Sequence, residues 1–295
     1  SPADVAREPG GRGRPPRQRT VTLCALLVPS VAAIALFLAR REVDTPRILF
    51  CDVGQGDAIA IRWRDRAILI DGGPRAESIV PQLVDRGIHH LDAVVLTHAH
   101  PDHCGGLPAV IEQLGTEEVW ISPRRFSGEC AQQILASCLT THTPIRILRA
   151  TTTRDAGELQ IETHLPTLTF RRSPENNASV VLRVHVAGRT ILLTGDIERE
   201  AELWLADRDL RADVLKVAHH GSRSSTSETL LNAVQPRLAF ISCGRRNLFG
   251  HPHQQVLDAL DAHRVRTWRT DREGTLELEI RGGHLFVRPQ FDTPN

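Results

Sequence analysis

Residues 97–103 read THAHPDH and directly follow the apolar run LDAVVL. Three histidines and one aspartate therefore lie in a short loop at the end of a predicted strand. Neutral imidazole and carboxylate groups suit Zn, Mn or Fe, and the alternate spacing of His98 and His100 lets both point to one ion. Asp102 and His103 can then bind a neighbouring ion. The loop therefore predicts a site for two divalent metal ions.

Two later segments supply ligands that one loop cannot. The run LLTGD ends a predicted strand with Asp196, which is placed to bridge two ions, although it could instead cap the following helix. The run VLKVA leads into His219 and His220. We expect His219 to bind metal because it follows the strand directly, and His220 to orient substrate or to pack beside it. Asp102 and Asp196 are also the candidate proton acceptors of a metal-assisted hydrolysis.

Three further segments are expected near the metal ions. Asp71, in the run LIDGG, is expected to accept a hydrogen bond from a metal-binding histidine, although an Asp-Gly pair can also simply form a turn. His251 precedes Pro252 at a predicted helix start, where a substrate phosphate could be received or the loop could merely cap the helix. Asp57 and Gln55 lie on a glycine-flanked turn that could reach the mouth of the site.

The chain from Arg47 to about residue 290 alternates short strands with helices. Predicted strands form two series, at 48–52, 58–63, 67–70 and 93–96, and then at 180–186, 190–193, 214–217, 238–241 and 276–280. Predicted helices lie at 77–86, 198–206, 226–234 and 252–263. Strands in two clusters with helices between them predict an α/β sandwich whose sheets lie inside.

The N-terminal part has a different character. Residues 1–20 are rich in Arg, Pro and Gly and predict a flexible basic segment. Residues 21–39 carry no charge and as a helix would span about 28 Å, close to a bilayer core. They predict a transmembrane helix, with a signal peptide or a buried soluble helix as alternatives. More arginines precede this span than follow it, which places the N-terminus in the cytoplasm and the rest outside. The absence of Met indicates processing or a piece of a longer chain.

Composition narrows the classes of function. With 41 % hydrophobic and 24 % charged residues, the chain can bury a sizeable core and is not a disordered protein. A formal net charge of +1 gives no argument for nucleic acid. Lys216 is the only lysine, a pattern more typical of GC-rich coding than of selection for phosphate contacts. The six cysteines include no Cys-x-x-Cys pair, so most are predicted to be buried free thiols.

The HxHxDH loop, the TGD turn and the later histidines resemble the metallo-β-lactamase superfamily. This resemblance covers nearly all of residues 47–290 and implies an αββα sandwich with two metal ions between the sheets. The runs DVGQGDA, KVAHHGS, FGHPH and TDREG are similar to the C-terminal domain of the ComEC family, the DNA-uptake channels of natural competence. In that family the domain follows a set of membrane helices, which fits a span at residues 21–39. The residues that match superfamily ligand positions are His98, His100, Asp102, His103, Asp196 and His219.

The sequence departs from the wider superfamily at one position. Hydrolases of this fold usually carry a further histidine between the first loop and the bridging aspartate. The run NNAS, residues 176–179, stands in its place, and Asn177 is expected to support the site or to contact substrate. Because an amide binds transition metals weakly, the first ion would be held loosely or completed by substrate or water.

The resemblance implies a metal-dependent nuclease that cleaves DNA phosphodiesters during uptake, with Mn or Zn as its two ions. Its implied partners are DNA, the membrane and other competence proteins, with no nucleotide cofactor. The hydrolase domain would lie on the outer, or periplasmic, side of the cell membrane. Paired arginines at 124–125 and 245–246 could contact phosphate, although either pair alone is more typical of a solvated surface. No aromatic series for base stacking is visible. Two alternatives stay open: a non-catalytic module that positions DNA in the channel, and a small-molecule metallohydrolase of the lactonase or β-lactamase type.

Overall fold

A computed structural model describes residues 45–291, except residues 125, 150, 157–158 and 167–174. The predicted basic segment at 1–20 and the predicted membrane span at 21–39 lie outside the described residues. Within the described part of the chain, no helix is both long enough and apolar enough to cross a membrane.

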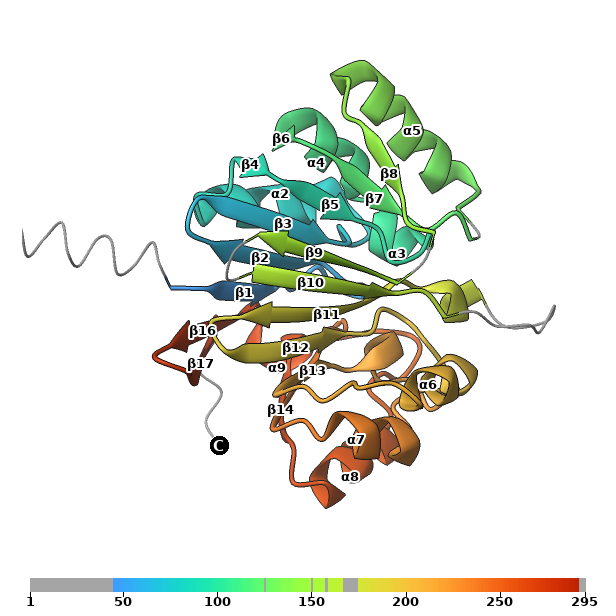
Figure 1. Cartoon of the computed structure of the whole chain (residues 1–295), viewed down its shortest axis with the longest axis vertical. Coiled ribbons are helices and arrows are strands. Elements are labelled where there is room, and N and C mark those ends of the chain that lie inside the picture. Colours follow the sequence, from blue (N-terminus) through green and yellow to red (C-terminus); the bar gives the residue numbers. More distant parts are fainter. Residues whose placement is uncertain (1–44, 125, 150, 157–158, 167–174, 292–295) are drawn as a thin grey trace, which may run out of the picture. The chain divides into compact units, whose positions relative to one another are not determined.

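Two mixed β-sheets lie face to face at the centre (Figure 1). In spatial order, the first sheet contains β17 (His284–Pro289), β16 (Leu276–Arg281), β1 (Arg47–Phe50), β2 (Ile59–Trp63), β3 (Arg66–Ile70), β5 (Ala93–Val95), β7 (Val119–Ile121) and β8 (Ile145–Ile147). The second contains β15 (Arg266–Arg269), β14 (Leu238–Ile241), β13 (Val214–Lys216), β12 (Arg189–Leu193), β11 (Val181–Val186), β10 (Leu159–His164) and β9 (Thr152–Ala156). A short separate ladder pairs β4 (His90–Leu91) with β6 (Gly115–Thr116).

Helices cover the outer face of each sheet (Figure 1). The helices on the side of the first sheet are α2 (Ala76–Asp85), α3 (Pro101–Cys104), α4 (Leu107–Gln113) and α5 (Glu129–Thr141). The later helices are α6 (Arg199–Ala206), α7 (Glu228–Val234), α8 (Gln254–Ala262) and α9 (Thr270–Glu273), of which the first three cover the second sheet. Two single 3₁₀ turns, η1 (Glu175–Ala178) and η2 (Ala218–Gly221), interrupt the loops between them. The predicted αββα sandwich is therefore present.

The core between the sheets follows from the alternation of apolar side chains along the strands. In β16, which reads LELEIR, Leu276, Leu278 and Ile280 all face this core. Phe50 of β1 and Phe240 of β14 stack across the two sheets, with their ring centroids 4.1 Å apart. Separate apolar clusters join each sheet to its own helices, so both faces of each sheet are packed, as expected for a four-layer fold.

One strand lies in a different sheet from the one its place in the sequence indicated. The strand at 276–280 was grouped with the second series, but it pairs antiparallel with β1, where Leu278 lies opposite Ile48. Pairing between β1 and β16, the first and next-to-last strands of the domain, is not local, so strand spacing along the chain could not reveal it.

A disulfide links α3 to α5. Cys104 and Cys130 are bonded, with their Cα atoms 6.2 Å apart, whereas Cys51, Cys138 and Cys243 are buried free thiols as predicted. The expectation of mostly free thiols missed this pair because only the packing of α5 beside α3 brings the two residues together. The disulfide follows directly after His103, so it ties the metal-site loop to α5.

Candidate metal centre

The histidine-rich loop after β5 is held from below by Asp71. This buried carboxylate accepts hydrogen bonds from the backbone nitrogen and hydroxyl of Thr97, at 2.8 and 2.7 Å. It also accepts a hydrogen bond from Nδ1 of His103 at 2.7 Å, so the predicted bond from a histidine to Asp71 is present. Because Nδ1 of His103 donates to Asp71, Nε2 is left to face the centre of the site.

A tight turn after β12 places Asp196 at the same centre. Gly195 has φ +53°, and a Cβ there would lie 3.0 Å from Cβ of Ser179 and 3.2 Å from Cβ of Thr97. Both the backbone conformation and the space therefore favour glycine. The next helix, α6, begins at Arg199 with Glu198 as its N-cap, so the alternative in which Asp196 caps this helix is wrong.

The two histidines after β13 adopt an unusual backbone conformation. His219 and His220 have φ values of 48° and 55°, in the left-handed region that side chains other than glycine seldom occupy. The His220 side chain is buried, and its Nδ1 donates a hydrogen bond to the carbonyl oxygen of Ser242 at 2.9 Å. Its Nε2 therefore points toward Asp196. The strained backbone of this turn thus orients the imidazole of His220.

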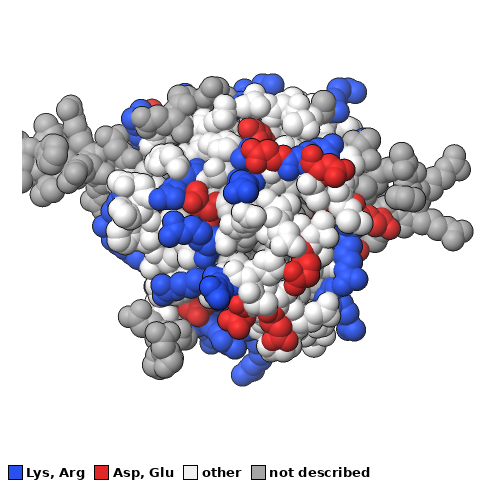
Figure 2. All heavy atoms as spheres, turned by 60° about the horizontal axis from the view of Figure 1, so that its bottom comes forward, with Lys and Arg blue, Asp and Glu red and all other residues white. Residues whose placement is uncertain are grey.

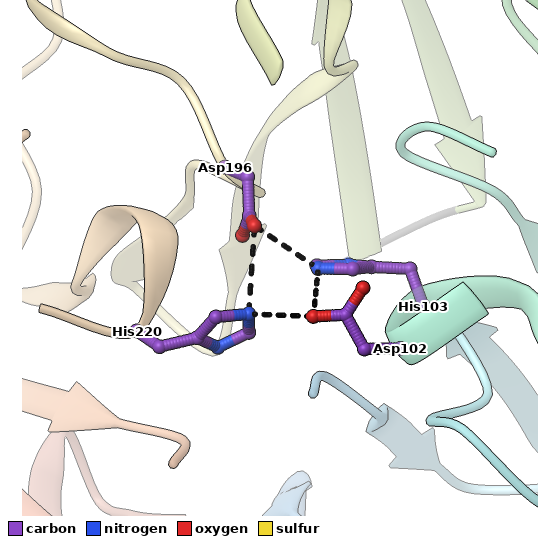
Figure 3. Close-up of side chains that lie close together, drawn as sticks. All are labelled: Asp102, His103, Asp196 and His220. Atoms are coloured by element: carbon purple, nitrogen blue, oxygen red, sulfur yellow. Dashed lines mark ion pairs between the residues drawn. The ribbon is translucent and has the colours of Figure 1, made fainter. Parts of the chain in front are cut away.

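Four side chains from three separate loops meet in one cluster (Figure 3). Oδ2 of Asp196 lies 3.2 Å from Nε2 of His103 and 3.4 Å from Nε2 of His220. Oδ2 of Asp102 lies 3.4 Å from Nε2 of His220 and 4.0 Å from Nε2 of His103. The four ligand atoms are mutually close enough to surround a single cation.

His220 occupies the place in this cluster that we expected for His219. Nε2 of His219 is 3.8 Å from Oδ2 of Asp196, and its Nδ1 is 3.3 Å from Oε1 of Glu198. Its side chain is 22 % exposed, against 1 % for His220. We had assumed that the residue nearest the strand would point into the site. The left-handed turn directs His220 inward instead, so His219 lies at the rim of the site, on the outer side of Asp196.

His98 and His100 approach Asp196 from a further side. Nε2 of His98 is 4.0 Å from Oδ2 of Asp196, and the ring centroids of His98 and His100 are 4.6 Å apart. His100 is more exposed, and its Nε2 lies 3.4 Å from Oε2 of Glu175, the first residue of η1. In this second group His100 is partly exposed to solvent, as Asp102 is in the first group.

The two asparagines of residues 176–179, the segment that stands in place of the usual further histidine, make different contacts. Asn176 places its amide nitrogen 3.4 Å from both ring nitrogens of His219. Asn177, which was expected to support the site or contact substrate, accepts a hydrogen bond from the backbone nitrogen of Glu198 at 2.7 Å. Asn177 therefore fixes η1 against the start of α6, and Asn176 is the amide that faces an imidazole.

Several buried polar atoms around Asp196 have no hydrogen-bond partner in the described part of the chain. They are Nε2 of His98, His103 and His220 and Oδ1 of Asp196. Buried nitrogen and oxygen atoms are normally paired, because leaving them unpaired costs free energy. The unpaired atoms belong to side chains that converge on Asp196, and imidazole nitrogens with carboxylate oxygens are suitable donors for a divalent transition metal. The residues present therefore fit a metal centre.

The carboxylate of Asp196 stays charged in the metal-free protein. Burial alone would raise its pKa, but His103 and His220 hold that pKa well below its ordinary value. Burial likewise acts to lower the pKa of His220, but Asp196 and Asp57 raise it to about 9. Burial and the nearby His103 lower the pKa of His98 well below its usual range. Protons on His103 and His220 thus compensate the charge of Asp196, and a cation would compete with them.

We had expected Asp57 to lie near the mouth of the site, but it lies beneath the cluster. It is 1 % exposed, its Oδ2 is 2.7 Å from Nζ of Lys216, and its Oδ1 is 3.6 Å from Nδ1 of His220. The turn is drawn inward because Gly56 packs against Asp102: a Cβ on Gly56 would lie 2.1 Å from the Asp102 carbonyl oxygen. The backbone nitrogen of Asp57 donates to that same oxygen at 3.2 Å.

Gln55 and His251 lie at the rim of the site. Nε2 of Gln55 is 3.5 Å from Nδ1 of His251, whose ring centroid is 5.7 Å from that of His219. Burial, with His220 and His219 nearby, lowers the pKa of His251 to about 4, so its imidazole is neutral near pH 7. The helix α8 begins only at Gln254, with His253 as N-cap, so His251 precedes that helix and does not cap it.

Residues that sequence reasoning missed include Glu198, Ser179 and Ser242. Glu198 contacts His219, the Ser179 hydroxyl lies 3.3 Å from Nδ1 of His98, and the Ser242 carbonyl orients His220. Glu198 could have been noticed as the next acidic residue after Asp196. A backbone carbonyl carries no sequence signal at all.

The chain belongs to the metallo-β-lactamase superfamily, whose family model matches residues 51–245. It is similar to ComE operon protein 3 of Bacillus subtilis (strain 168), with 32 % identity over 82 % of this chain and 34 % of that protein. It is also similar to competence protein ComA of Neisseria gonorrhoeae, with 30 % identity over 95 % of this chain and 41 % of that protein. The resemblance to the ComEC family is therefore confirmed, and the chain spans well under half the length of these curated relatives.

A solved structure supports the fold. The metallo-β-lactamase fold protein YhfI from Bacillus subtilis matches with a TM-score of 0.52 and 15 % identity, over 80 % of this chain and 99 % of that one. At this level of identity the match shows the shared fold alone.

Proposed function

We propose that this domain is a metal-dependent phosphodiesterase that cleaves DNA during its uptake. The observation that carries the proposal is the convergence on Asp196 of buried imidazoles from segments that are distant in sequence, with Nε2 atoms that have no hydrogen-bond partner among the described residues. Such an arrangement is costly unless a cation completes it.

Two groups of residues would hold the ions. Asp102, His103, Asp196 and His220 would bind one, and His98 and His100, with Asp196 shared, would bind the other. Zn and Mn both suit this donor set. Bound divalent ions supply Lewis-acid activation of water and compensate negative charge on the phosphate.

The protein's own groups orient these ligands and accept a proton. Asp71 holds His103 and the Ser242 carbonyl holds His220, so both rings are fixed with Nε2 inward. The side chain of Asp102 is 33 % exposed, whereas that of Asp196 is 3 % exposed. Asp102 is therefore the better candidate to take a proton from a nucleophile that arrives from solvent.

The choice of DNA rests on the competence proteins to which the chain is similar. We infer that the domain works with the membrane and with other competence proteins, on the outer side of the cell membrane, without a nucleotide cofactor. The disulfide between Cys104 and Cys130 supports an outer location, because disulfides persist in oxidising compartments.

The decisive experiment is a titration of Mn and Zn into the chain with linear single-stranded and double-stranded DNA. Wild type should cleave DNA only with metal, and Asp102→Ala should abolish cleavage. Asp209→Ala is a matched control, because this aspartate has a side chain 73 % exposed and no part in the cluster. Equal cleavage by wild type and Asp102→Ala would contradict the proposal.

A non-catalytic module that positions DNA is the second candidate, favoured by the amide of Asn176 beside the cluster where hydrolases of this fold usually have a histidine. Such a module should bind DNA equally well with and without chelator and should cleave none. The same titration therefore separates the two functions.

A further inference from the structure

The loop between β14 and α8 exposes two large apolar side chains side by side. Leu248 is 98 % exposed and Phe249 is 64 % exposed. No other two exposed large apolar residues in the described part of the chain are consecutive in sequence. Neither side chain is buried in a hydrophobic core, and adjacent exposed apolar side chains can mark a binding site.

The tip of this loop is held in place and not left loose. Asn247 donates hydrogen bonds from its amide to the carbonyl oxygens of Gly244 and His251, at 2.8 and 2.7 Å, and accepts one from the backbone nitrogen of His251 at 2.8 Å. Gln55 accepts a further bond from the backbone nitrogen of Gly244 at 3.2 Å. One side chain thus closes the loop at its base and presents Leu248 and Phe249 outward.

The exposed ring leads directly to the metal centre. Phe249 stacks on His251, with ring centroids 5.6 Å apart and planes inclined by 22°. The His251 ring in turn lies 6.2 Å from that of His220, which belongs to the metal cluster. A planar group stacked near Phe249 would therefore lie two ring contacts from the candidate reaction centre.

Arginines flank this path. Arg245 and Arg246 precede the exposed tip, and Arg223 follows the histidine turn; all three are exposed. On the face shown in Figure 2, basic and acidic side chains are interspersed. Binding of a polyanion would therefore depend on a few local cations and on contacts other than charge.

We propose that Phe249 is a stacking site for an unpaired base of single-stranded DNA beside the metal centre, with Arg245 and Arg246 contacting the adjoining phosphates. This inference rests on the proposed function, whose substrate class it narrows. Aromatic rings bind the faces of unpaired bases without sequence preference. In a duplex the base faces are covered by their neighbours, so the ring distinguishes single strands from duplex DNA.

The experiment measures equilibrium binding of a fluorescein-labelled short oligothymidylate by the whole chain in EDTA, by fluorescence anisotropy at fixed salt. An abasic oligomer of the same length and charge and a short duplex serve as comparison probes. Phe249→Leu removes the ring but keeps an apolar side chain, and Phe249→Trp keeps a ring. Phe286→Leu is the matched control, because Phe286 is also exposed, at 46 %, but lies on β17.

We expect Phe249→Leu to weaken oligothymidylate binding about tenfold, within the range for losing one stacked base. Phe249→Trp should bind at least as well as wild type. Binding of the abasic oligomer and of the duplex should not change in either variant, and Phe286→Leu should match wild type throughout. Arg245→Ala and Arg246→Ala should weaken binding of the oligothymidylate and the abasic oligomer alike.

Three results would overturn the inference. Phe249→Leu could bind oligothymidylate as wild type does, or lose the abasic oligomer to the same extent, or lose affinity for anionic lipid vesicles while its DNA binding is unchanged. The last result would assign the apolar tip to a membrane surface. Metal-dependent cleavage with no effect of substitution at Phe249 would refute the stacking site but support the proposed nuclease activity. Base-dependent binding through Phe249 without cleavage would support the stacking site but refute the nuclease activity.

Discussion

Asp57 and Asp196 are two carboxylates buried within the same site, and their surroundings differ in one respect. Asp57 is paired with the ammonium of Lys216 at 2.7 Å, and Lys216 has no exposed surface. Among the described residues no Lys or Arg pairs with Asp196, whose Oδ2 lies within 4.0 Å of four imidazoles, from His98, His103, His219 and His220. The ammonium of Lys216 compensates the charge of Asp57 permanently. The imidazoles around Asp196 can lose their protons, so a metal ion can take over the compensation of that carboxylate.

Removal of the open carboxylate should have the largest effect. Asp196→Ala takes away the atom around which the imidazoles converge, so we expect metal-dependent cleavage to fall by about 10⁴-fold or more. The measurement is the single-turnover rate with Mn or Zn at saturating DNA. A decrease of less than tenfold would mean that Asp196 is no more than another buried acid.

The two adjacent histidines should respond unequally. His220→Ala removes a ring buried in the cluster and should lower cleavage by about 10³-fold. His219→Ala should lower it by less than about tenfold, because this ring lies at the rim. Cleavage rates of the two variants at matched metal concentration test the difference, and the reverse order would restore His219 as the ligand.

The closed pair should matter for stability. Lys216→Met leaves the buried charge of Asp57 without its ammonium partner, which we expect to lower the free energy of unfolding by about 3 kcal/mol or more. Urea unfolding in EDTA measures this without any contribution from metal. The double variant Asp57→Asn with Lys216→Met should recover much of the loss; if both variants are equally unstable, the lysine acts through packing and not through charge.

A moderate effect is expected at Asp71. Asp71→Asn keeps the shape of the side chain but weakens its hold on Nδ1 of His103, so metal affinity should fall by about 10- to 100-fold. Calorimetric titration of the chain with Zn measures the affinity. Asp92→Asn, whose carboxylate contacts Arg66 away from the site, should bind Zn as wild type does.

Features of the site that depend on residue types at strand ends were predictable from the sequence, whereas the directions of individual side chains were not. The loop at 97–103 and its link to Asp71 follow from residue types at the ends of predicted strands, and both the sandwich and this hydrogen bond were predicted. The choice between His219 and His220 depends on two consecutive left-handed residues, which no hydrophobic pattern encodes. Likewise, a stacking role for Phe249 could not be predicted, because one aromatic ring on a loop forms no series along the chain.

Contacts between distant segments account for the other differences. Lys216 was visible in the sequence, but its pairing with Asp57 depends on how the first turn of the domain packs under β13. The disulfide between Cys104 and Cys130 and the pairing of β16 with β1 are of the same kind. In each case the partner is set by tertiary packing, which spacing along the chain does not report.

The burial of Lys216 has a practical consequence for covalent labelling. Because it is the only lysine in the sequence and has no exposed surface, an amine-reactive dye added to the folded protein should leave its side chain unlabelled. Labelling at Lys216 would then report that the ion pair beneath the metal centre had opened.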